Sequence, residues 1–305
     1  MRPELTQAIE LLQSDSPADL ERAIAMLQQT VYSFSMKVCG HPEDAEDTMQ
    51  EVLYRSLSHL AKLQEPRALA VWLYTVTRNR CWRMRRKGAS VPKEILSLGE
   101  LMPDEVELGR LLKNASDSPE ANVLRGEEHE KLHRAILRIP PPLRLVLVLH
   151  DMEELTTEEV AQVLDLQPGT VRVRLHRARL GVRKELSRSG TISTGRKTPG
   201  SAKRLPSKRR PLKPSQQCRE MFAQLSEYLD GHMEPRSCDE MQQHIDACPS
   251  CVAFLRDLRS AIDRCRSMKV SCDPAVAKGL RKLLTREYLR LLGTSRSGVG
   301  SPQVL

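Results

Sequence analysis

The sequence predicts an all-α protein, and three observations support this prediction. Apolar residues recur at helical spacing over long stretches of the chain, and no run of alternating β-branched residues marks a strand. Of the 305 residues, 40% are hydrophobic but only 3% are aromatic. A chain of this length favours two or three small helical domains over one large core.

The positive charge of the chain is concentrated in one segment. The formal net charge is +9, yet residues 187–217 alone contain nine Lys or Arg side chains and no acid. This segment is rich in Pro, Gly and Ser and cannot form a buried core. We predict a disordered basic linker that divides the chain into two parts. The overall charge permits a nucleic-acid partner without requiring one.

The N-terminal part contains a predicted helix over residues 18–39. Ser16 and Pro17 provide a start signal, and Gly40 provides a stop signal. The apolar stripe of this helix consists of Leu20, Ile24, Leu27, Val31, Phe34 and Val38. A further short helix is predicted within residues 1–13.

Residues 41–87 predict two helices of opposite charge, separated at Pro66. The acids of the first are Glu43, Asp44, Glu46, Asp47 and Glu51, and its apolar stripe is Val52, Leu53, Leu57 and Leu60. The second ends in the bases Arg78, Arg80, Arg83, Arg85, Arg86 and Lys87. In the second helix, near-helical spacing is seen for Val71, Trp72, Thr75, Val76 and Asn79. On charge alone, two solvated amphipathic helices are the simpler interpretation, and a protein-binding face beside a nucleic-acid-binding face is the alternative.

The order of residues in this segment resembles region 2 of bacterial sigma factors of the extracytoplasmic-function type, within the sigma-70 family. The resemblance covers about residues 18–87 and rests on D-A-E-D-x-x-Q-E at 44–51, W-L-Y-x-x-x-R-N at 72–79 and the basic run that follows. It implies that the acidic helix binds the clamp coiled coil of RNA polymerase through Asp44, Glu46, Asp47, Gln50 and Glu51. It also implies that the basic helix binds the −10 promoter element through Arg78, Asn79 and Arg83.

A helix-turn-helix is predicted between residues 143 and 186. After an apolar helix, Thr156 and Glu159 form a capping-box pair that opens a short helix, and a tight turn follows at 166–169. The buried stripe of the next helix is Val171, Leu175, Ala178 and Val182, and off this stripe lie Arg172, Arg174, Arg177, Arg179 and Arg183. A helix covered with arginine after such a turn is typical of a recognition helix in the major groove of DNA. A helical hairpin with a solvated basic face is the alternative.

This segment resembles region 4 of the same sigma factors. The resemblance rests on P-x-x-x-R-x-V-x-x-L from Pro140, E-E-V-A at 158–161 and G-T-V-R-x-R-L-x-R-A-R at 169–179. It implies that the second helix binds the −35 promoter element through Thr170, Arg172, Arg174 and Arg177. The family often has a small polar residue at the position of Val173.

A cluster of cysteine and histidine follows the basic linker. His244, Cys248 and Cys251 have the spacing H-x3-C-x2-C, which places two metal ligands one helical turn apart and the third after a Pro-Ser turn. A tetrahedral structural zinc site needs a fourth ligand, for which Cys218 and Cys238 are the candidates. Thiols in a small apolar core are the alternative. So short a segment, however, buries too little apolar surface to be stable without a cross-link such as a metal ion.

The same segment resembles the zinc-binding anti-sigma domain, whose pattern is C…H-x3-C-x2-C with a Y-L-D-G helix end, here residues 228–231. The resemblance implies that Cys218 is the fourth ligand to one structural zinc ion and that Cys238 stays outside. In that family the domain covers the polymerase-binding faces of sigma modules. Inhibition within the chain, redox sensing and an additional contact all stay open for the fused domain, and Cys265 and Cys272 have no assigned role.

The sequence therefore predicts two small helical sigma modules, a region 2 bundle and a region 4 helix-turn-helix, with a zinc-stapled helical domain after them. The expected segments are 1–88 (region 2), 89–118 (a linker), 119–187 (region 4), 188–214 (the basic linker) and 215–305 (the zinc-binding, anti-sigma-like domain with a helical tail).

We expect a transcription initiation factor that binds core RNA polymerase and promoter DNA and is regulated by contacts with its own zinc domain. A stand-alone helix-turn-helix regulator is the alternative. An enzyme is disfavoured, because four protein ligands leave a zinc ion no open position for catalysis. We also expect a cytoplasmic protein with reduced cysteines, since the sequence shows no membrane-length apolar stretch and no signal-peptide layout.

Overall fold

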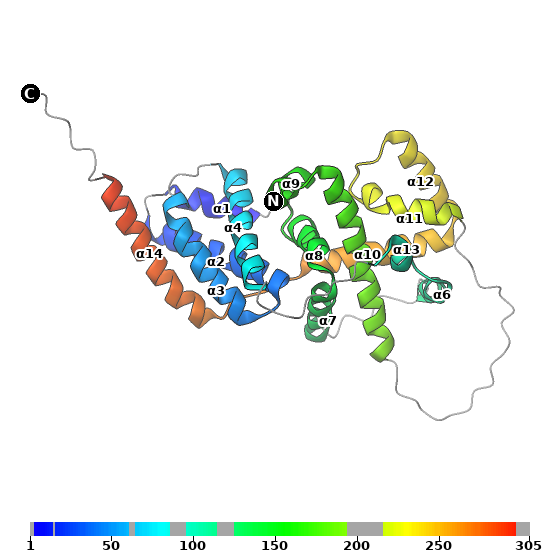
Figure 1. Ribbon diagram of the computed structural model, residues 1–305, viewed down its shortest axis with the longest axis horizontal. Helices are drawn as coiled ribbons and strands as arrows, with labels where there is room; N and C mark the ends of the chain where they lie inside the picture. The colour runs from blue at the N-terminus through cyan, green and yellow to red at the C-terminus, as the bar shows by residue number, and fades with distance from the viewer. Residues whose placement is uncertain are drawn as a thin grey trace, which may run out of the picture. The chain divides into compact units, whose positions relative to one another are not determined.

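A computed structural model describes residues 3–14, 16–60, 65–85, 96–114, 125–193 and 216–296, and all regular secondary structure in these ranges is helical (Figure 1). The all-α prediction is thereby confirmed for the described part of the chain. Contacts divide the chain into two compact units. Unit 1 comprises Met1–Val91, Val148–Pro168 and Lys269–Leu305, and unit 2 comprises Pro92–Leu147 and Gly169–Met268.

Unit 1 is built on the helices α1 (Pro3–Leu12), α2 (Pro17–Cys39), α3 (Pro42–Leu60) and α4 (Pro66–Arg85). Each of them begins at a proline, whose fixed φ suits the first helical turn. The predicted apolar stripe of α2 is buried, and α1, α3 and α4 all pack against this helix. Gly40 ends α2 with a φ of 84°, a left-handed conformation that glycine adopts readily, and its N–H donates to the Met36 carbonyl.

The helix α4 buries a different face from the predicted one. The residues of the predicted pattern, Val71, Trp72, Thr75, Val76 and Asn79, are only half-buried. The core contains Leu69, Ala70, Leu73, Tyr74, Thr77 and Cys81 instead. The ring of Trp72 lies against the ring of the exposed His59, tilted by 45° and with 5.0 Å between centroids. The predicted pattern included Trp72 because its side chain is large. An indole ring has an apolar body and a polar N–H, so it is also stable at the edge of a core.

Three later segments complete unit 1. The π-helix η1 (Val148–Met152) precedes α9 (Thr157–Leu164), and α9 begins with the predicted capping box. The Thr156 hydroxyl accepts from the Glu159 N–H at 3.2 Å, and the Glu159 carboxylate accepts from the Thr156 N–H at 2.8 Å. The helix α9 packs against α4, and η1 packs against α2. The helix α14 (Pro274–Arg296) lies along α2 and α3 (Figure 1).

Unit 2 contains the helices α5 (Leu98–Leu101), α6 (Glu105–Asn114), α7 (Arg125–Arg138), α8 (Pro141–Leu147), α10 (Pro168–Ser193), α11 (Gln216–Leu229), α12 (Pro235–Ala247) and α13 (Pro249–Ser267). The helices α5 and α6 lie where a linker with transient helix is expected. The expected turn residues Pro168 and Gly169 form the first turn of α10, which continues to Ser193 and so enters the expected basic linker. The rest of that linker, residues 194–215, lies outside the described residues.

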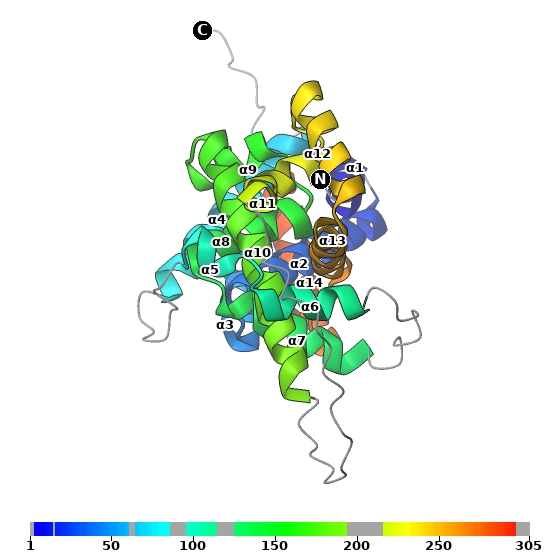
Figure 2. The ribbon, with the colours of Figure 1, turned by 90° about the vertical axis from the view of Figure 1, so that its right-hand side faces the viewer.

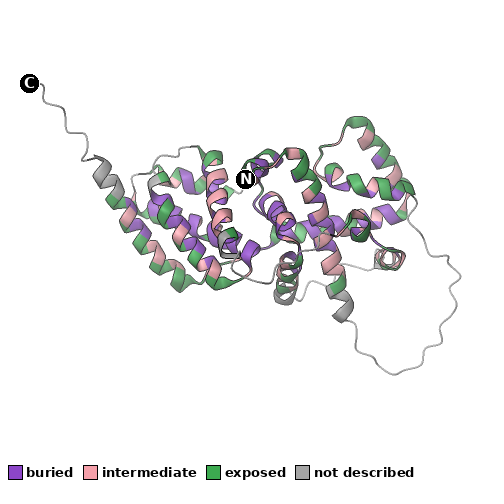
Figure 3. Cartoon of the chain, viewed as in Figure 1, coloured by how far each residue is buried: buried purple, intermediate pink, exposed green. Residues whose placement is uncertain are grey.

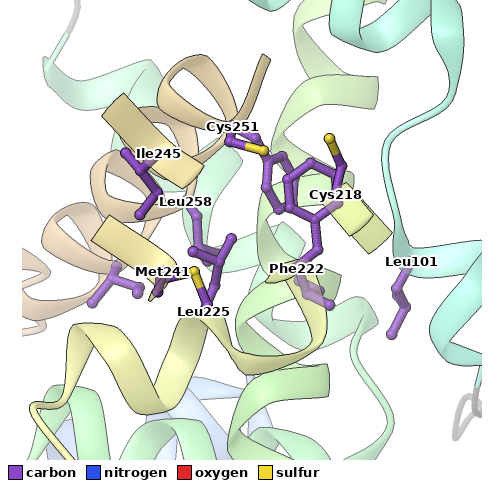
Figure 4. Packing of buried hydrophobic residues seen from close by; sticks show 11 residues of the cluster. Leu101, Cys218, Phe222, Leu225, Met241, Ile245, Cys251 and Leu258 are labelled. Atoms are coloured by element: carbon purple, nitrogen blue, oxygen red, sulfur yellow. The ribbon is translucent and has the colours of Figure 1, made fainter. Parts of the chain in front are cut away.

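The core of unit 2 joins the predicted metal-binding segment to α5 and α10. Buried side chains of α11, α12 and α13 gather around the rings of Phe222 and Phe254, whose centroids are 4.4 Å apart (Figure 4). Leu101 of α5 and Leu180 of α10 belong to the same cluster. The helix α6 packs against α13, as Figure 2 shows. The burial of Leu180 gives α10 a second packed face, besides the stripe that contains Val171.

The predicted domain limits stay a prediction, because the compact units combine segments from several predicted domains. Val148–Pro168 falls in predicted region 4 and Lys269–Leu305 falls in the predicted zinc-binding domain, yet both belong to unit 1. Among the described helices, none is both long enough and apolar enough to cross a membrane.

Candidate protein, nucleic-acid and metal sites

The predicted polymerase-binding residues lie along one side of α3. Asp44, Glu46 and Glu51 are half-buried, and Asp47 and Gln50 are exposed. The opposite side of α3 is held in the core of unit 1 by Ala45, Met49, Val52 and Leu53. Glu51 forms ion pairs with Arg80 of α4 at 2.7 Å and with Arg55 at 3.1 Å. The structure therefore presents an acidic surface on a helix whose other side is firmly packed.

The helix α14 lies beside this acidic surface. Between them is a cavity of about 460 Å³, which is lined by Asp47, Gln50, Glu51, Tyr54 and Arg80 and, from α14, by Leu280 and Leu283. Gln28 of α2 holds α14 through two hydrogen bonds: its Nε2 donates to the Ala277 carbonyl at 3.1 Å, and its Oε1 accepts from Arg281 Nε at 3.4 Å. Leu284 and Tyr288 are the buried hydrophobic residues in the described part of α14, and much of the rest of the helix is exposed (Figure 3).

Two of the three predicted −10-binding side chains are described by the structure. The Arg78 guanidinium donates to the side-chain oxygen of Asn79 from Nε at 3.1 Å and from Nη2 at 2.7 Å. Burial lowers the pKa of Arg78 from its ordinary value, and the nearby Asp165 carboxylate opposes this shift. Arg83 belongs to α4, but its side chain lies outside the described residues. The structure thus brings two members of the predicted set together.

A buried ion pair that sequence reasoning missed joins the segment before α9 to α2 and α4. Lys37 Nζ of α2 donates to Glu153 Oε1 at 2.7 Å, and the Tyr74 hydroxyl of α4 donates to Glu153 Oε2 at 2.9 Å. The side chains of Lys37 and Glu153 are 0% and 1% exposed. The position of Lys37 directly before Val38 of the buried stripe indicates that its charge could be buried. Nothing in the neighbouring sequence identifies Glu153 as its partner. Removing either charge would leave the other buried without its ionic partner.

The predicted −35-binding residues lie on the open side of α10. Thr170 and Arg172 are exposed, and Arg174 and Arg177 are half-buried. A shallow depression of about 400 Å³ is lined by Pro142, Leu143, Gly169, Thr170, Val173, Arg174 and Arg177. The predicted stripe of Val171, Leu175, Ala178 and Val182 is buried on the other side. The packed stripe holds the helix in place, so its basic side chains project from a fixed backbone.

Two other arginines of α10, Arg179 and Arg183, lie off the predicted apolar stripe and are nevertheless buried. Arg179 donates to both carboxylate oxygens of Asp230, from Nη1 and from Nη2, at 2.8 Å each. Arg183 pairs with Glu107 at 2.6 Å and with Asp257 at 3.2 Å, and its guanidinium lies 4.7 Å from the centre of the Phe254 ring. Their acidic partners come from α6, α13 and the end of α11, far away in sequence. Helical spacing could therefore not identify these pairs.

His176 adds a neutral polar contact between α10 and α11. Its Nδ1 lies 2.9 Å from the Ser226 hydroxyl oxygen. Burial, together with the positive charges of Arg179 and Arg177, lowers the pKa of His176 to about 4. At neutral pH the ring is therefore uncharged, and the hydroxyl can donate to it or accept from it.

The four predicted metal ligands lie together in unit 2. Cys218 comes from α11 and His244 from α12, while Cys248 and Cys251 stand at the start of α13. Their donor atoms all lie within 4.8 Å of one another. Burial and the thiols of Cys248 and Cys218 raise the pKa of Cys251 above its ordinary value. In the described part of the chain, Cys238 is not a member of this group.

Two of the donor distances match those of a tetrahedral metal site, and the distance from His244 Nε2 to Cys251 Sγ is shorter than in such a site. Cys218 Sγ lies 3.8 Å from Cys248 Sγ and 3.6 Å from His244 Nε2, and His244 Nε2 lies 3.1 Å from Cys251 Sγ. A tetrahedral zinc ion with bonds of about 2.3 Å to sulfur and 2.0–2.1 Å to nitrogen would place its ligands about 3.8 Å (S to S) and 3.6 Å (S to N) apart. Three thiols and one imidazole are the donors of a metal site, and their chemistry suits a soft or borderline cation.

Comparisons with known families match each of the three segments. Residues 23–91 match the family described as Sigma-70 region 2, and residues 129–180 match Sigma-70, region 4. Residues 218–251 match a family described as "Putative zinc-finger". The first and last of the four candidate metal ligands, Cys218 and Cys251, stand at the limits of that last match.

Curated relatives are similar to about half of the chain. RNA polymerase sigma factor YlaC of Bacillus subtilis is 27% identical over 175 residues, which is 57% of this chain and 94% of the relative. ECF RNA polymerase sigma factor SigW of the same organism is 27% identical over 176 residues, 56% of this chain and 89% of the relative. ECF RNA polymerase sigma-E factor of Escherichia coli is 29% identical over 137 residues, 45% of this chain and 70% of the relative.

Region 2 followed by region 4 defines the class of the protein, and the chain belongs to the sigma-70 type of RNA polymerase sigma factors. Within this class it is similar to the extracytoplasmic-function factors and carries an additional anti-sigma-like zinc-finger segment after region 4. The chain is thus a transcription initiation factor that directs polymerase to promoters. This identification favours the main functional hypothesis over the stand-alone regulator.

Proposed function

We propose that this sigma factor binds core RNA polymerase with the acidic side of α3 and binds promoter DNA with α4 and α10. We further propose that its own C-terminal segments hold it in a closed, inactive form. The observation that carries the proposal is the position of α14 along α3, where Leu280 and Leu283 line one cavity with Asp47 and Glu51. A polymerase surface that uses these carboxylates must compete with α14.

The acidic side of α3 supports the assignment of the polymerase contact. Asp44, Glu46, Asp47 and Glu51 follow one another along a single helix, and the core of unit 1 fixes that helix from behind. A basic partner would be attracted to such a surface at a distance, and the charge would also set its orientation. The acids therefore suit a protein contact better than a nucleic-acid contact.

The open side of α10 supports the assignment of the −35 contact. Thr170 and Arg172 are exposed, and Arg174 and Arg177 line the same depression as Thr170. Arginine in the major groove can donate two hydrogen bonds to a guanine, or it can neutralise a phosphate. Arg78 and Asn79 of α4 are the described candidates for the −10 contact.

The metal centre is assigned to one structural zinc ion. Its support is the close grouping of the donor atoms of Cys218, His244, Cys248 and Cys251, together with their place beside the core of unit 2. Zinc bound there would link α11, α12 and α13 beside the apolar core that they share. In a small domain the free energy of metal binding contributes directly to folding.

The contacts of α10 suggest which step the closed form blocks. Arg179 is paired with Asp230, and Arg183 is paired with Asp257, so the zinc-binding segment is attached to this helix. Thr170 and Arg172 nevertheless remain exposed. The proposed DNA-reading residues are therefore open, while the proposed polymerase-binding residues lie beside α14. We infer that closure acts on polymerase binding before it acts on promoter recognition.

The test is run-off transcription with core polymerase and two variants of α14. Leu284→Glu places a charge at a completely buried position, whereas Leu289→Glu changes an exposed leucine of the same helix. Leu284→Glu should release α14 and raise polymerase binding and transcription by about fivefold or more, the lower end of typical coupling between sites. Leu289→Glu should behave like the unmodified chain. Polymerase affinity and transcript yield are measured at equal concentrations of folded protein.

Other outcomes would separate the parts of the proposal. Unchanged or lower activity of Leu284→Glu, in a chain that remains folded, would contradict inhibition by α14 and leave the sigma assignment intact. Charge reversal at Asp44, Glu46 and Asp47 should abolish polymerase binding in both backgrounds. Normal polymerase binding by that folded variant would contradict the assignment of the α3 surface.

A further inference from the structure

Val173 is an exposed apolar side chain in the middle of the basic face of α10. Its side chain is 57% exposed, whereas its apolar neighbours on either side, Val171 and Leu175, are 0% and 2% exposed. Single apolar residues are common on protein surfaces, so exposure alone identifies no site. The position of Val173 among the proposed DNA-binding residues is the informative observation.

The geometry of α10 places Val173 on the same face as these residues. Thr170 stands three positions before it and Arg177 four positions after it, and residues at these spacings are neighbours on a helix surface. Thr170, Val173 and Arg177 also line the same depression. A DNA surface that contacts the hydroxyl and the guanidinium must therefore meet the isopropyl group between them.

The side chain of Val173 does not serve the core of unit 2. The buried stripe of α10 lies on the other side of the helix, and the buried Leu180, on the same side as Val173, lies seven positions further along, about two helical turns away. Replacing Val173 should therefore leave the fold intact. This makes the position suitable for a test of function alone.

We propose that Val173 is a specificity-determining residue of the −35 contact and that it packs against the 5-methyl group of a thymine. The proposal rests on the proposed role of α10 in DNA binding. Thymine is the one base that presents a methyl group in the major groove, and an apolar side chain recognises it by contact. Flanking arginines would supply most of the affinity, and the valine would add a preference for thymine at one position.

The experiment uses the full chain bound to core polymerase and duplexes with a defined chemical change. The preferred −35 sequence is first selected from a library of promoters that are randomised in this region. Each thymine of the selected sequence is then replaced singly by deoxyuridine, which lacks only the 5-methyl group. For the unmodified chain, one replacement should weaken binding by about fourfold, the effect of removing one buried methyl group from a contact.

Two valine variants give the comparison. Val173→Ser should bind the thymine and deoxyuridine duplexes equally well, because the methyl contact is gone. Val106→Ala is the matched control, since Val106 of α6 is also exposed, at 64%, and lies outside α10. It should keep the fourfold preference. The proposal would be overturned if Val173→Ser still preferred the thymine duplex over the deoxyuridine duplex. It would also be overturned if the unmodified chain showed no such preference at any thymine.

The proposed function has a separate readout in the same experiment. Arg174→Ala and Arg177→Ala should each weaken binding to the selected duplex. If the library yields no −35 preference and neither arginine variant changes affinity, α10 does not read DNA and both proposals fail. If the arginines matter but no thymine methyl does, the proposal for Val173 alone is wrong.

Discussion

Buried charge is the main feature of this protein at the scale of single residues. Lys37, Arg179 and Arg183 are each no more than 1% exposed, and each is paired with a carboxylate from a distant segment. Two charges removed from water are tolerated only when they compensate each other closely. These ion pairs therefore favour the one arrangement of the helices that brings both partners together. Any arrangement that separates the partners while keeping them buried is destabilised.

His176 should make the stability of unit 2 depend on pH. Its pKa in the folded protein is lowered to about 4, below the value near 6.5 expected for the unfolded chain. Between these values the unfolded chain binds a proton that the folded chain excludes. The free energy of unfolding should therefore fall as the pH falls from about 6.5 to about 4, by at most about 3 kcal/mol for this group.

Denaturant unfolding across this pH range tests the role of His176. The substitution His176→Gln removes the titrating group but keeps a polar side chain for Ser226, so the dependence on pH should become shallower. The exposed His232 is the matched control, and His232→Gln should keep the original dependence. Parallel curves for His176→Gln and the unmodified chain would contradict the prediction.

At the scale of elements, local patterns predicted the helices well where one face is apolar and the ends carry signals. The stripe of α2, its end at Gly40 and the Thr156 capping box are all present as expected. The buried face of α4 was predicted wrongly, because the half-buried Trp72 dominated the pattern. The tight spacing of the Cys and His ligands was visible in sequence, since three of the four lie within one short motif.

The same local patterns could not reveal contacts between distant elements. Arg179 forms an ion pair with Asp230, which follows α11, and Lys37 forms an ion pair with Glu153, which follows η1. Helical periodicity reports that a side chain leaves the apolar stripe, but it carries no information about what covers the remaining surface. For this reason the position of α14 beside the acidic surface of α3 was also beyond prediction, although its helix was expected.

The metal-binding element gives a prediction about its ligands. In the full chain, Cys218→Ala, His244→Ala, Cys248→Ala and Cys251→Ala should each lower bound zinc from one ion per chain and reduce helix content, because metal binding contributes to folding. Cys238→Ala should retain the ion. Elemental analysis of the purified protein gives the stoichiometry, and circular dichroism gives the helix content.

A cysteine control separates ligand loss from a packing defect. Cys265 is 1% exposed and does not belong to the metal group. Cys265→Ala should lower stability but retain the ion. Retention of zinc by Cys218→Ala together with its loss from Cys238→Ala would show that the fourth ligand had been chosen wrongly.

At the scale of the whole molecule, the packing within unit 1 bears on the proposed binding of both promoter elements, because α9 directly precedes the helix proposed to bind the −35 element. Unit 1 contains α4 of region 2 packed against α9 of region 4. The −10 and −35 elements are about 25 base pairs apart, roughly 85 Å at about 3.4 Å per base pair. A compact unit of about 150 residues has a radius of gyration of only about 15 Å. If α4 and α10 bind these elements as proposed, we expect α9 to leave α4 and the Lys37–Glu153 pair to break.

A double-mutant cycle tests whether the Lys37–Glu153 pair acts as a latch, that is, whether it stabilises the packing of the segment before α9 against α2. Lys37→Met or Glu153→Gln alone leaves one buried charge uncompensated and should lower the free energy of unfolding by about 3–5 kcal/mol. The double variant removes both charges and keeps an acceptor for the Tyr74 hydroxyl, so it should recover most of this loss. Denaturant unfolding measures the three variants.

An exposed pair on the same helix is the control for the cycle. Arg22 of α2 lies 3.6 Å from Asp19 with its side chain 68% exposed, and Arg22→Met should cost less than about 1 kcal/mol. If the two single losses simply add in the Lys37→Met/Glu153→Gln variant, the pair is not coupled and the latch hypothesis is wrong.

The order of α3 and α14 along the chain also sets a time interval during synthesis. Pro274 lies 214 positions after Leu60, and ribosomes add about 5–20 residues per second, so α3 is made roughly 10–40 s before α14 begins. During this interval α3 can fold with α2 and α4 and meet polymerase without its competitor. Each molecule would then pass once, during translation, through a state in which α3 can bind polymerase. Where its messenger RNA is translated close to free polymerase, some molecules would bind polymerase before α14 can pack against α3.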